Sequence, residues 1–228
     1  MMTTPLSIVI PVLDEASTIE GTLRALAPLR ERGAEVIVAD GGSSDSTLPL
    51  AEPLADRVLS APRGRARQMN AGAAVALGDV LLFLHADTQL PAAADVLVQE
   101  ALARGDVVWG RFDVRIVGRP AMLRVVAAFM NARSRWTGVA TGDQGIFVRR
   151  QVFASVGGFA DQPLMEDIAL CKRLLHSVGR PACLRARVST SGRRWETRGV
   201  WRTIFLMWQL RWRYWRGESP HKLAEDYR

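Results

Sequence analysis

Three acidic segments follow stretches that are typical of buried strands. They are Asp14-Glu15 after residues 6–12, Asp40 after residues 35–39, and His85-Ala86-Asp87 after residues 79–84. Open α/β sheets bind ligands at the carboxyl ends of their parallel strands, so these carboxylates should line one crevice. Carboxylate oxygens bind hard metal ions or the hydroxyl groups of a polar ligand. The sequence therefore predicts a ligand-binding crevice that holds a metal ion or contacts several hydroxyl groups.

The elements that would position these residues alternate between strand-like and helix-like patterns over residues 1–105. Helical apolar spacing covers 17–32, for example, between two strand-like stretches. This alternation is typical of βαβ units and of a mostly parallel sheet flanked by helices. Farther along, we expect strands over 107–116 and 182–189 and helices over 120–135 and 165–177. No repeat or low-complexity linker divides the chain, so we predict a single α/β domain.

The composition favours an anionic partner. The chain has 228 residues, a net charge of +7 and a pI near 10.5, which suits nucleotide phosphates, a membrane surface or nucleic acid. Nucleic acid is the least favoured, because no recognised binding module accompanies the charge.

The cysteines and the apolar segments bear on the compartment. Cys171 and Cys183 lack metal-type spacing, so we expect two buried free thiols in a reducing environment. No secretory signal is evident, and the longest apolar stretches fall short of the roughly 20 residues that a membrane span needs. We therefore expect a cytoplasmic protein, with peripheral contact to the inner face of the membrane as an open alternative.

Six motifs in order resemble glycosyltransferase family 2, whose members have the Rossmann-like GT-A fold. They are Pro11 with Asp14-Glu15, residues 39–45, 67–72 and 85–87, the stretch 148–159, and Glu166-Asp167. Asp14 replaces the family's usual Asn, and His85 replaces the first Asp of its DxD metal motif. Residues 84–88, 142–145 and 193–196 are similar to a compact bacterial subgroup labelled as arsenosugar-biosynthesis glycosyltransferases. The resemblance divides residues 1–197 into a nucleotide-binding half (1–105) and an acceptor half (106–197).

The resemblance implies a nucleotide-sugar donor and a divalent cation, Mn²⁺ or Mg²⁺, that neutralises the departing diphosphate. Asp87 would bind the cation, and its alternative role is to cap the turn before Pro91. Asp40 would accept a hydrogen bond from the base, which favours uracil, or else would cap the turn 41–44. Pro11, Asp14 and Glu15 would border the nucleoside, although the two acids could equally cap the first helix.

Arginines would bind the diphosphate. Arg63, Arg65 and Arg67 surround a glycine at a helix start, and Arg67 is preferred by its motif position. A solvated basic loop is the alternative. Arg193 and Arg194 resemble, with Trp195, the arginine–tryptophan element of processive members, and would close over the pyrophosphate. The leading Gln of that element is absent, which argues against a polymerising enzyme.

An inverting transfer needs a base beside the acceptor hydroxyl. The resemblance assigns this role to Asp167, with Glu166 next to it, at the start of a predicted helix. Successive helical residues diverge by about 100°, so only one of the two can point at the acceptor. The alternative is that both acids complement the helix dipole. Asp143 would bind a sugar or stabilise its glycine-rich loop.

Residues 198–228 are basic and rich in tryptophan, and we expect one amphipathic helix with a tail. Aromatic residues recur at spacings of four and three, which places them on one face: Trp201, Phe205, Trp208, Trp212 and Trp215. Three alternatives stay open for this face: packing on the domain core, contact with a membrane, or a homodimer seam.

The leading hypothesis is an inverting, metal-dependent glycosyltransferase that uses a UDP-sugar and an unidentified acceptor. One alternative is a nucleotidyltransferase acting on a sugar phosphate, although the glycine-rich, lysine-containing signature expected after the first strand is absent. The other is a non-catalytic, membrane-associated protein that binds nucleotide-sugars. A dinucleotide-dependent reductase is disfavoured, because no G-x-G-x-x-G follows the first strand.

Overall fold

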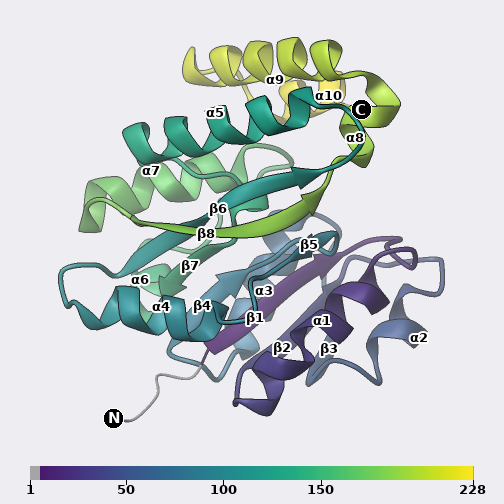
Figure 1. The fold of residues 1–228 in the computed structure, drawn as a ribbon, viewed down its shortest axis with the longest axis vertical. Coiled ribbons are helices and arrows are strands. Elements are labelled where there is room, and N and C mark those ends of the chain that lie inside the picture. Colours follow the sequence, from purple (N-terminus) through teal and green to yellow (C-terminus); the bar gives the residue numbers. More distant parts are fainter. Residues whose placement is uncertain (1–5, 228) are drawn as a thin grey trace.

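The computed structural model describes residues 6–227, which form one α/β domain around an eight-stranded sheet (Figure 1). The strands are β1 (Leu6–Val12), β2 (Glu35–Asp40), β3 (Arg57–Ser60), β4 (Val80–Phe83), β5 (Thr88–Gln89), β6 (Trp109–Val117), β7 (Ile146–Arg149) and β8 (Ala182–Ser191). The helices are α1 (Ile19–Glu31), α2 (Thr47–Ala51), α3 (Arg65–Val75), α4 (Ala94–Ala103), α5 (Met122–Thr137), the short η1 (Gly142–Gln144), α6 (Arg150–Ser155), α7 (Glu166–Val178), α8 (Arg193–Arg198), α9 (Val200–Trp215) and α10 (Pro220–Tyr227).

The first half of the sheet is parallel and has the order β3-β2-β1-β4. All seven residues of β1 and all four of β4 are buried, as expected for strands that helices cover on both faces. In the register, Val12 at the end of β1 pairs with Asp40 at the end of β2. The strands that precede the three acidic segments are therefore neighbours, as the sequence predicts.

The second half continues the sheet as β7-β6-β8-β5. Strand β7 is antiparallel to both β4 and β6, whereas β6 and β8 run parallel. The strand expected over 107–116 is β6. It is buried on both faces over its first four residues, and only its second part alternates between buried and more exposed residues. Helix α5 packs on this half, and α9 lies across the outside of α5 (Figure 1).

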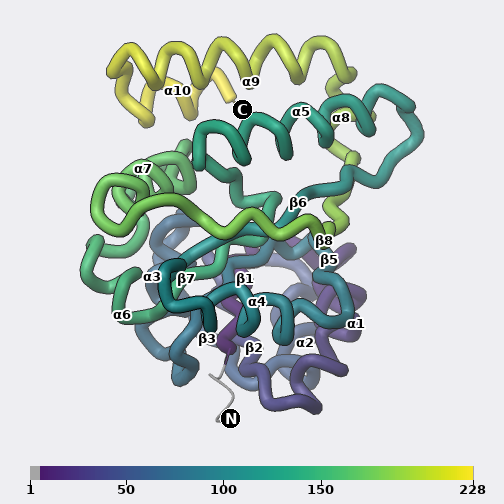
Figure 2. The backbone as a smooth tube through the Cα atoms, turned by 60° about the vertical axis from the view of Figure 1, so that its left-hand side comes forward, coloured from purple at the N-terminus to yellow at the C-terminus, as the bar shows by residue number. Residues whose placement is uncertain are grey.

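The basic tail differs from the expected single helix. Gly199, which follows α8, and Gly217, both with positive φ, bound α9, and the tail then continues as α10, which folds back beside α9 (Figure 2). Leu210 of α9 and Leu223 of α10 share a small buried cluster with the 164–168 segment.

The tryptophan stripe lies on the opposite face of α9, and each of its five aromatic side chains is more than half exposed. Of the three alternatives for this stripe, packing on the domain core is therefore wrong. Periodicity shows which residues share a face but not what covers them. Within residues 6–227, no helix combines the length and apolarity needed to cross a membrane.

Candidate active site

A cavity of about 640 Å³ opens at the carboxyl ends of β1 and β4. Asp87 and Asp167, the predicted cation ligand and the predicted base, both line it, as do Pro11, Glu15 and Glu166. The segments that carry them are far apart in sequence, and the sheet order brings them together. Asp14 and Asp40 are not among the lining residues.

Asp87 lies in the short segment between β4 and β5. Its backbone carbonyl accepts a hydrogen bond from Ser191 N at 3.2 Å, and the neighbouring Ala86 carbonyl accepts one from Thr22 Oγ1 at 2.6 Å. Buried Thr88 also bonds through its hydroxyl to Thr190 of β8 at 3.0 Å. The carboxylate is thus presented by a backbone that α1 and β8 both hold.

Asp40 and Asp14 hold the loop that follows β2. The Asp40 carboxylate accepts hydrogen bonds from the backbone N–H groups of Gly42 and Ser43 and from the Ser43 hydroxyl, at 2.5–3.1 Å. Asp14 accepts one from Ser44 N at 2.7 Å. The structure therefore contains the turn-capping arrangement of Asp40, and contact with a base stays a prediction.

Asp167 lies in the first turn of α7. Its Oδ2 accepts a hydrogen bond from Gly142 N at 2.9 Å, and its Oδ1 accepts one from Ile168 N at 2.7 Å. Burial and the neighbouring charge of Glu166 raise the pKa of Asp167 to about 6, against the lowering effect of these bonds and of Arg65. A carboxylate in this range can accept a proton near neutral pH.

Glu166 lines the same cavity as Asp167, and which of the two faces an acceptor stays a prediction. Glu166 is 4% exposed, and its Oε1 lies 3.5 Å from Nη1 of Arg65. The pair closes one wall of the cavity beside Asp167.

The arginines divide into two groups. Arg65, Arg193 and Arg194 line the cavity, and Arg193 lies 3.9 Å from Glu15. Arg67, the sequence-based choice, is not in the lining and forms a 2.8 Å ion pair with exposed Asp161. The two arginines are two residues apart on α3, which directs their side chains about 200° apart around the helix.

His85 contacts the glycine-rich segment 142–145, and the sequence motifs did not predict this contact. Nδ1 of His85 lies 3.2 Å from Oδ1 of Asp143. Burial acts to raise the pKa of Asp143, but its bond to His85 and the charges of His85, Arg65 and Arg194 outweigh this, and the pKa is lowered. A Cβ on Gly142 would lie 2.7 Å from Cε1 of His85 and closer still to Nε2. The close approach requires a glycine at this position.

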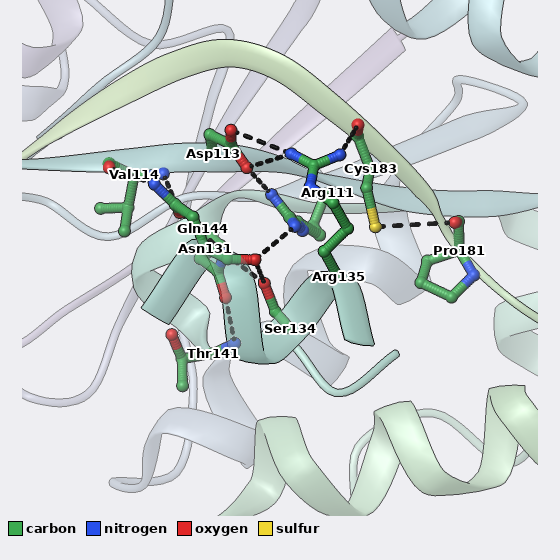
Figure 3. Close-up of polar contacts among 10 residues, drawn as sticks. All are labelled: Arg111, Asp113, Val114, Asn131, Ser134, Arg135, Thr141, Gln144, Pro181 and Cys183. Carbon is green, nitrogen blue, oxygen red and sulfur yellow. Dashed lines mark hydrogen bonds and ion pairs between the residues drawn. The ribbon is translucent and has the colours of Figure 1, made fainter. Parts of the chain in front are cut away.

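A buried polar network holds η1 and α5 in place (Figure 3). The Asn131 side chain bonds to both the N–H and the carbonyl of Val114 on β6, at 2.8 and 2.9 Å. Gln144 of η1 donates to the Ser134 hydroxyl of α5 at 3.0 Å. Fully buried Arg111 pairs with Asp113 in the same network. The network thereby positions the segment whose Gly142 N–H donates to Asp167.

Sequence reasoning missed the contribution of α5 to the cavity. Arg133 and the apolar side chains of this helix line it: Met122, Val125, Val126, Phe129 and Met130. The signal in the sequence is the apolar run 125–130 inside the predicted helix 120–135, but a run of this kind does not show which cavity it lines.

Asp87 fits a cation whose coordination shell is completed by a bound substrate. No cluster of three or more His, Cys, Asp or Glu side chains suited to a metal ion occurs within residues 6–227. Mg²⁺ is commonly held by one or two carboxylates together with substrate phosphates and water. Asp87 can provide that carboxylate, with the remaining ligands coming from a bound diphosphate.

The model of the family described as "Glycosyl transferase family 2" matches residues 7–157. A Mycobacterium bovis "PGL/p-HBAD biosynthesis glycosyltransferase" is 30% identical over 175 residues, which are 67% of this chain and 62% of the relative. The "Probable glycosyltransferase YdaM" of Bacillus subtilis is 27% identical over 93% of this chain and 55% of its own length. The chain therefore spans about six-tenths of the length of the curated relatives that it matches.

Solved structures share the fold. S. aureus TarS in complex with UDP-GlcNAc has a TM-score of 0.67 at 17% identity, covering 82% of this chain and 58% of that one. M. tuberculosis glucosyl-3-phosphoglycerate synthase in complex with Mg²⁺ and UDP has a TM-score of 0.59 at 22% identity, covering 81% and 69%. The sequence motifs and the cavity agree with the family match over residues 7–157. The chain therefore belongs to glycosyl transferase family 2.

Proposed function

We propose that the protein transfers a sugar from a UDP-sugar donor to an acceptor hydroxyl with inversion at the anomeric carbon. The observation that carries this proposal is a half-buried carboxyl with a raised pKa, Asp167, in the same cavity as Asp87 and five arginines. Structural neighbours crystallised with UDP-GlcNAc or with UDP and Mg²⁺ support the choice of donor.

In the proposed step, Asp167 accepts the proton of the acceptor hydroxyl as its oxygen attacks the anomeric carbon. The bond from that carbon to the diphosphate oxygen breaks on the opposite face, and UDP leaves with the electron pair. The developing negative charge is stabilised by Arg65, Arg193 and Arg194. A divalent cation held by Asp87 would neutralise further charge on the diphosphate.

The same assignment divides the domain. Residues up to 105 would bind the nucleotide, with Pro11, Asp14, Glu15 and Asp40 around the nucleoside. Residues 106–197 would bind the acceptor. Arg67 would reach the diphosphate only after leaving Asp161. The cytoplasm is the proposed location, because both cysteines are free thiols, as is usual in a reducing compartment. Cys171 is buried as expected, whereas Cys183 is partly exposed.

Thermal stability with nucleotides tests the donor site. A ligand that binds only the folded state raises its apparent stability, so UDP with Mn²⁺ should raise the melting temperature more than GDP or CDP does. Asp87→Ala should abolish the metal-dependent part of that rise. Asp106→Ala, which changes an exposed carboxylate in the loop before β6, is the matched control and should leave it intact.

Product release tests the chemistry. Asp167→Asn should retain UDP–metal binding and lose UDP release from a donor panel by about a hundredfold or more, as expected for removal of a general base. UDP binding without turnover of any donor by the unmodified protein favours the non-catalytic alternative. Release of pyrophosphate from UTP and a sugar phosphate favours the nucleotidyltransferase.

A further inference from the structure

The active-site cavity continues into an apolar groove between α5 and α9. On one side it is lined by the five apolar side chains of α5, and on the other by side chains of α9: Trp201, Ile204, Met207 and Trp208. Figure 2 shows the two helices side by side, with α9 on the outside. The cavity has the size of a ligand site, and most of the side chains that α5 and α9 contribute to it are apolar.

Two exposed aromatic residues form the mouth of the groove. Phe129 of α5 and Trp208 of α9 stack with their ring centroids 5.9 Å apart. Phe129 is 53% exposed and Trp208 is 60% exposed. This aromatic surface is continuous with the lining, so the apolar path leads from the protein surface to Asp167.

Arg133 lies at the inner end of the groove. Its Nε and Nη2 atoms are buried, and neither has a hydrogen-bond partner within residues 6–227. Burial lowers the pKa of Arg133, although the negative charge of Asp167 nearby acts against this. Buried N–H groups without a partner are costly, and an anionic oxygen is the acceptor that satisfies a guanidinium best.

The outer helix carries charge of one sign. Residues 200–216 include four arginines and no Asp or Glu. One of them, Arg211, lines the groove itself. Arg213 is neutralised by Glu218 and Asp226, so the charge that α9 offers to the groove comes from Arg211. The groove thus combines an apolar path with the positive charges of Arg133 and Arg211.

We propose that the acceptor is an anionic lipid whose head group carries the reacting hydroxyl. Its hydrocarbon chain would lie between α5 and α9, its phosphate on Arg133, and its hydroxyl at Asp167. This inference rests on the proposed function, because it assigns the acceptor of the same reaction. The hydroxyl proton passes to Asp167, the oxygen bonds to the anomeric carbon, and UDP departs.

Three probes separate the contributions of chain and charge. Lauroyl lysophosphatidylglycerol has an acyl chain, a phosphate and glycerol hydroxyls, whereas monolaurin lacks the phosphate and glycerol phosphate lacks the chain. Binding is measured by titration calorimetry below the micelle concentration, with UDP and Mn²⁺ present. The lysophospholipid should bind about tenfold or more tighter than either of the others.

Variants assign that binding to the groove. Phe129→Ser with Trp208→Ser should weaken lysophospholipid binding about tenfold or more, and both sites are exposed enough for the fold to tolerate the change. Arg133→Gln should remove the preference over monolaurin. Trp136→Ser is the control: this residue is 83% exposed on the same α5 but lies outside the lining, and binding should be unchanged.

Several results would overturn the inference. Equal binding of lysophospholipid and glycerol phosphate would refute the hydrocarbon path, and equal weakening by Trp136→Ser would show nonspecific adsorption. A dimer of the unmodified protein that the Phe129/Trp208 variant dissociates in sedimentation velocity would show that a second copy covers the groove. UDP–Mn²⁺ binding in the same samples tests the proposed function separately. Lipid binding without UDP–Mn²⁺ binding would refute the proposed function and leave the assignment of the groove unaffected.

Discussion

Asp167→Asn should lower the activity, and its effect on the free energy of unfolding should depend on pH. The pKa of Asp167 rises from its ordinary value of 3.8 to about 6 in the folded protein, chiefly because the group is buried. At a pH between these two values, Asp167 is ionised in the unfolded chain but protonated in the folded protein. The free energy of unfolding therefore falls as the pH rises through this window and is lowered by a constant amount above it.

The magnitude follows from the two pKa values. At 1.36 kcal/mol per pKa unit, ionised Asp167 disfavours the folded state by about 3 kcal/mol well above pH 6. At pH 4 the unfolded group is already partly ionised, so the change from pH 4 to pH 7.5 is about 2 kcal/mol. Replacing the carboxylate by an amide removes this dependence. The lost bond from Gly142 or Ile168 adds an offset that does not vary with pH.

Urea denaturation of both proteins, followed by tryptophan fluorescence at pH 4 and pH 7.5, measures the effect. The difference in unfolding free energy should shift in favour of the variant by about 2 kcal/mol between the two pH values. Asp161→Asn is the control with the opposite sign, because the bond from Arg67 lowers the pKa of Asp161. A difference for Asp167→Asn that stays constant within 1 kcal/mol would refute the assignment of a raised pKa. Because Glu166 adjoins it, the titration observed belongs to the pair.

Three further predictions concern the surroundings of the site. Gly142→Ala should lower kcat about tenfold or more without unfolding the protein, because its methyl group would displace His85. Adding His85→Ala should restore part of this loss, as steady-state assays would show. Gln68→Leu should lower the free energy of unfolding by about 1–3 kcal/mol in urea titrations, since the buried amide donates to backbone carbonyls at the ends of β1 and β2, at 2.6 and 2.9 Å. Cys171 should resist iodoacetamide at pH 8 in the native protein and react in urea, as mass spectrometry would show, because burial raises the pKa of its thiol to about 12.

Local patterns predicted the frame of the site. Apolar stretches bounded by acidic residues located three parallel strands, and these strands are neighbours in the sheet. The motif around Glu166-Asp167 placed an acid at the start of α7, as found. Such features depend on residues close together in the chain, so the order of residue types is enough to find them.

Side-chain partners could not be predicted in the same way. Arg65 and Arg67 occupy the same turn of α3, and the rotation of that helix against the sheet directs Arg65 to the cavity and Arg67 to Asp161. The sequence allows Asp40 two roles, contact with a base and capping of its own loop, and no sequence pattern separates them. The structure contains the capping bonds, and the base contact stays a prediction.

The tail shows the same division. The spacing of its aromatic residues placed them on one face, because helical periodicity is a property of the chain itself. That this face stays exposed, and that α5 lies opposite it to form a groove reaching Asp167, depends on contacts between segments about eighty residues apart. Burial, which raises the pKa of Asp167, is likewise a property of the packed molecule, because the desolvating atoms come from several elements at once.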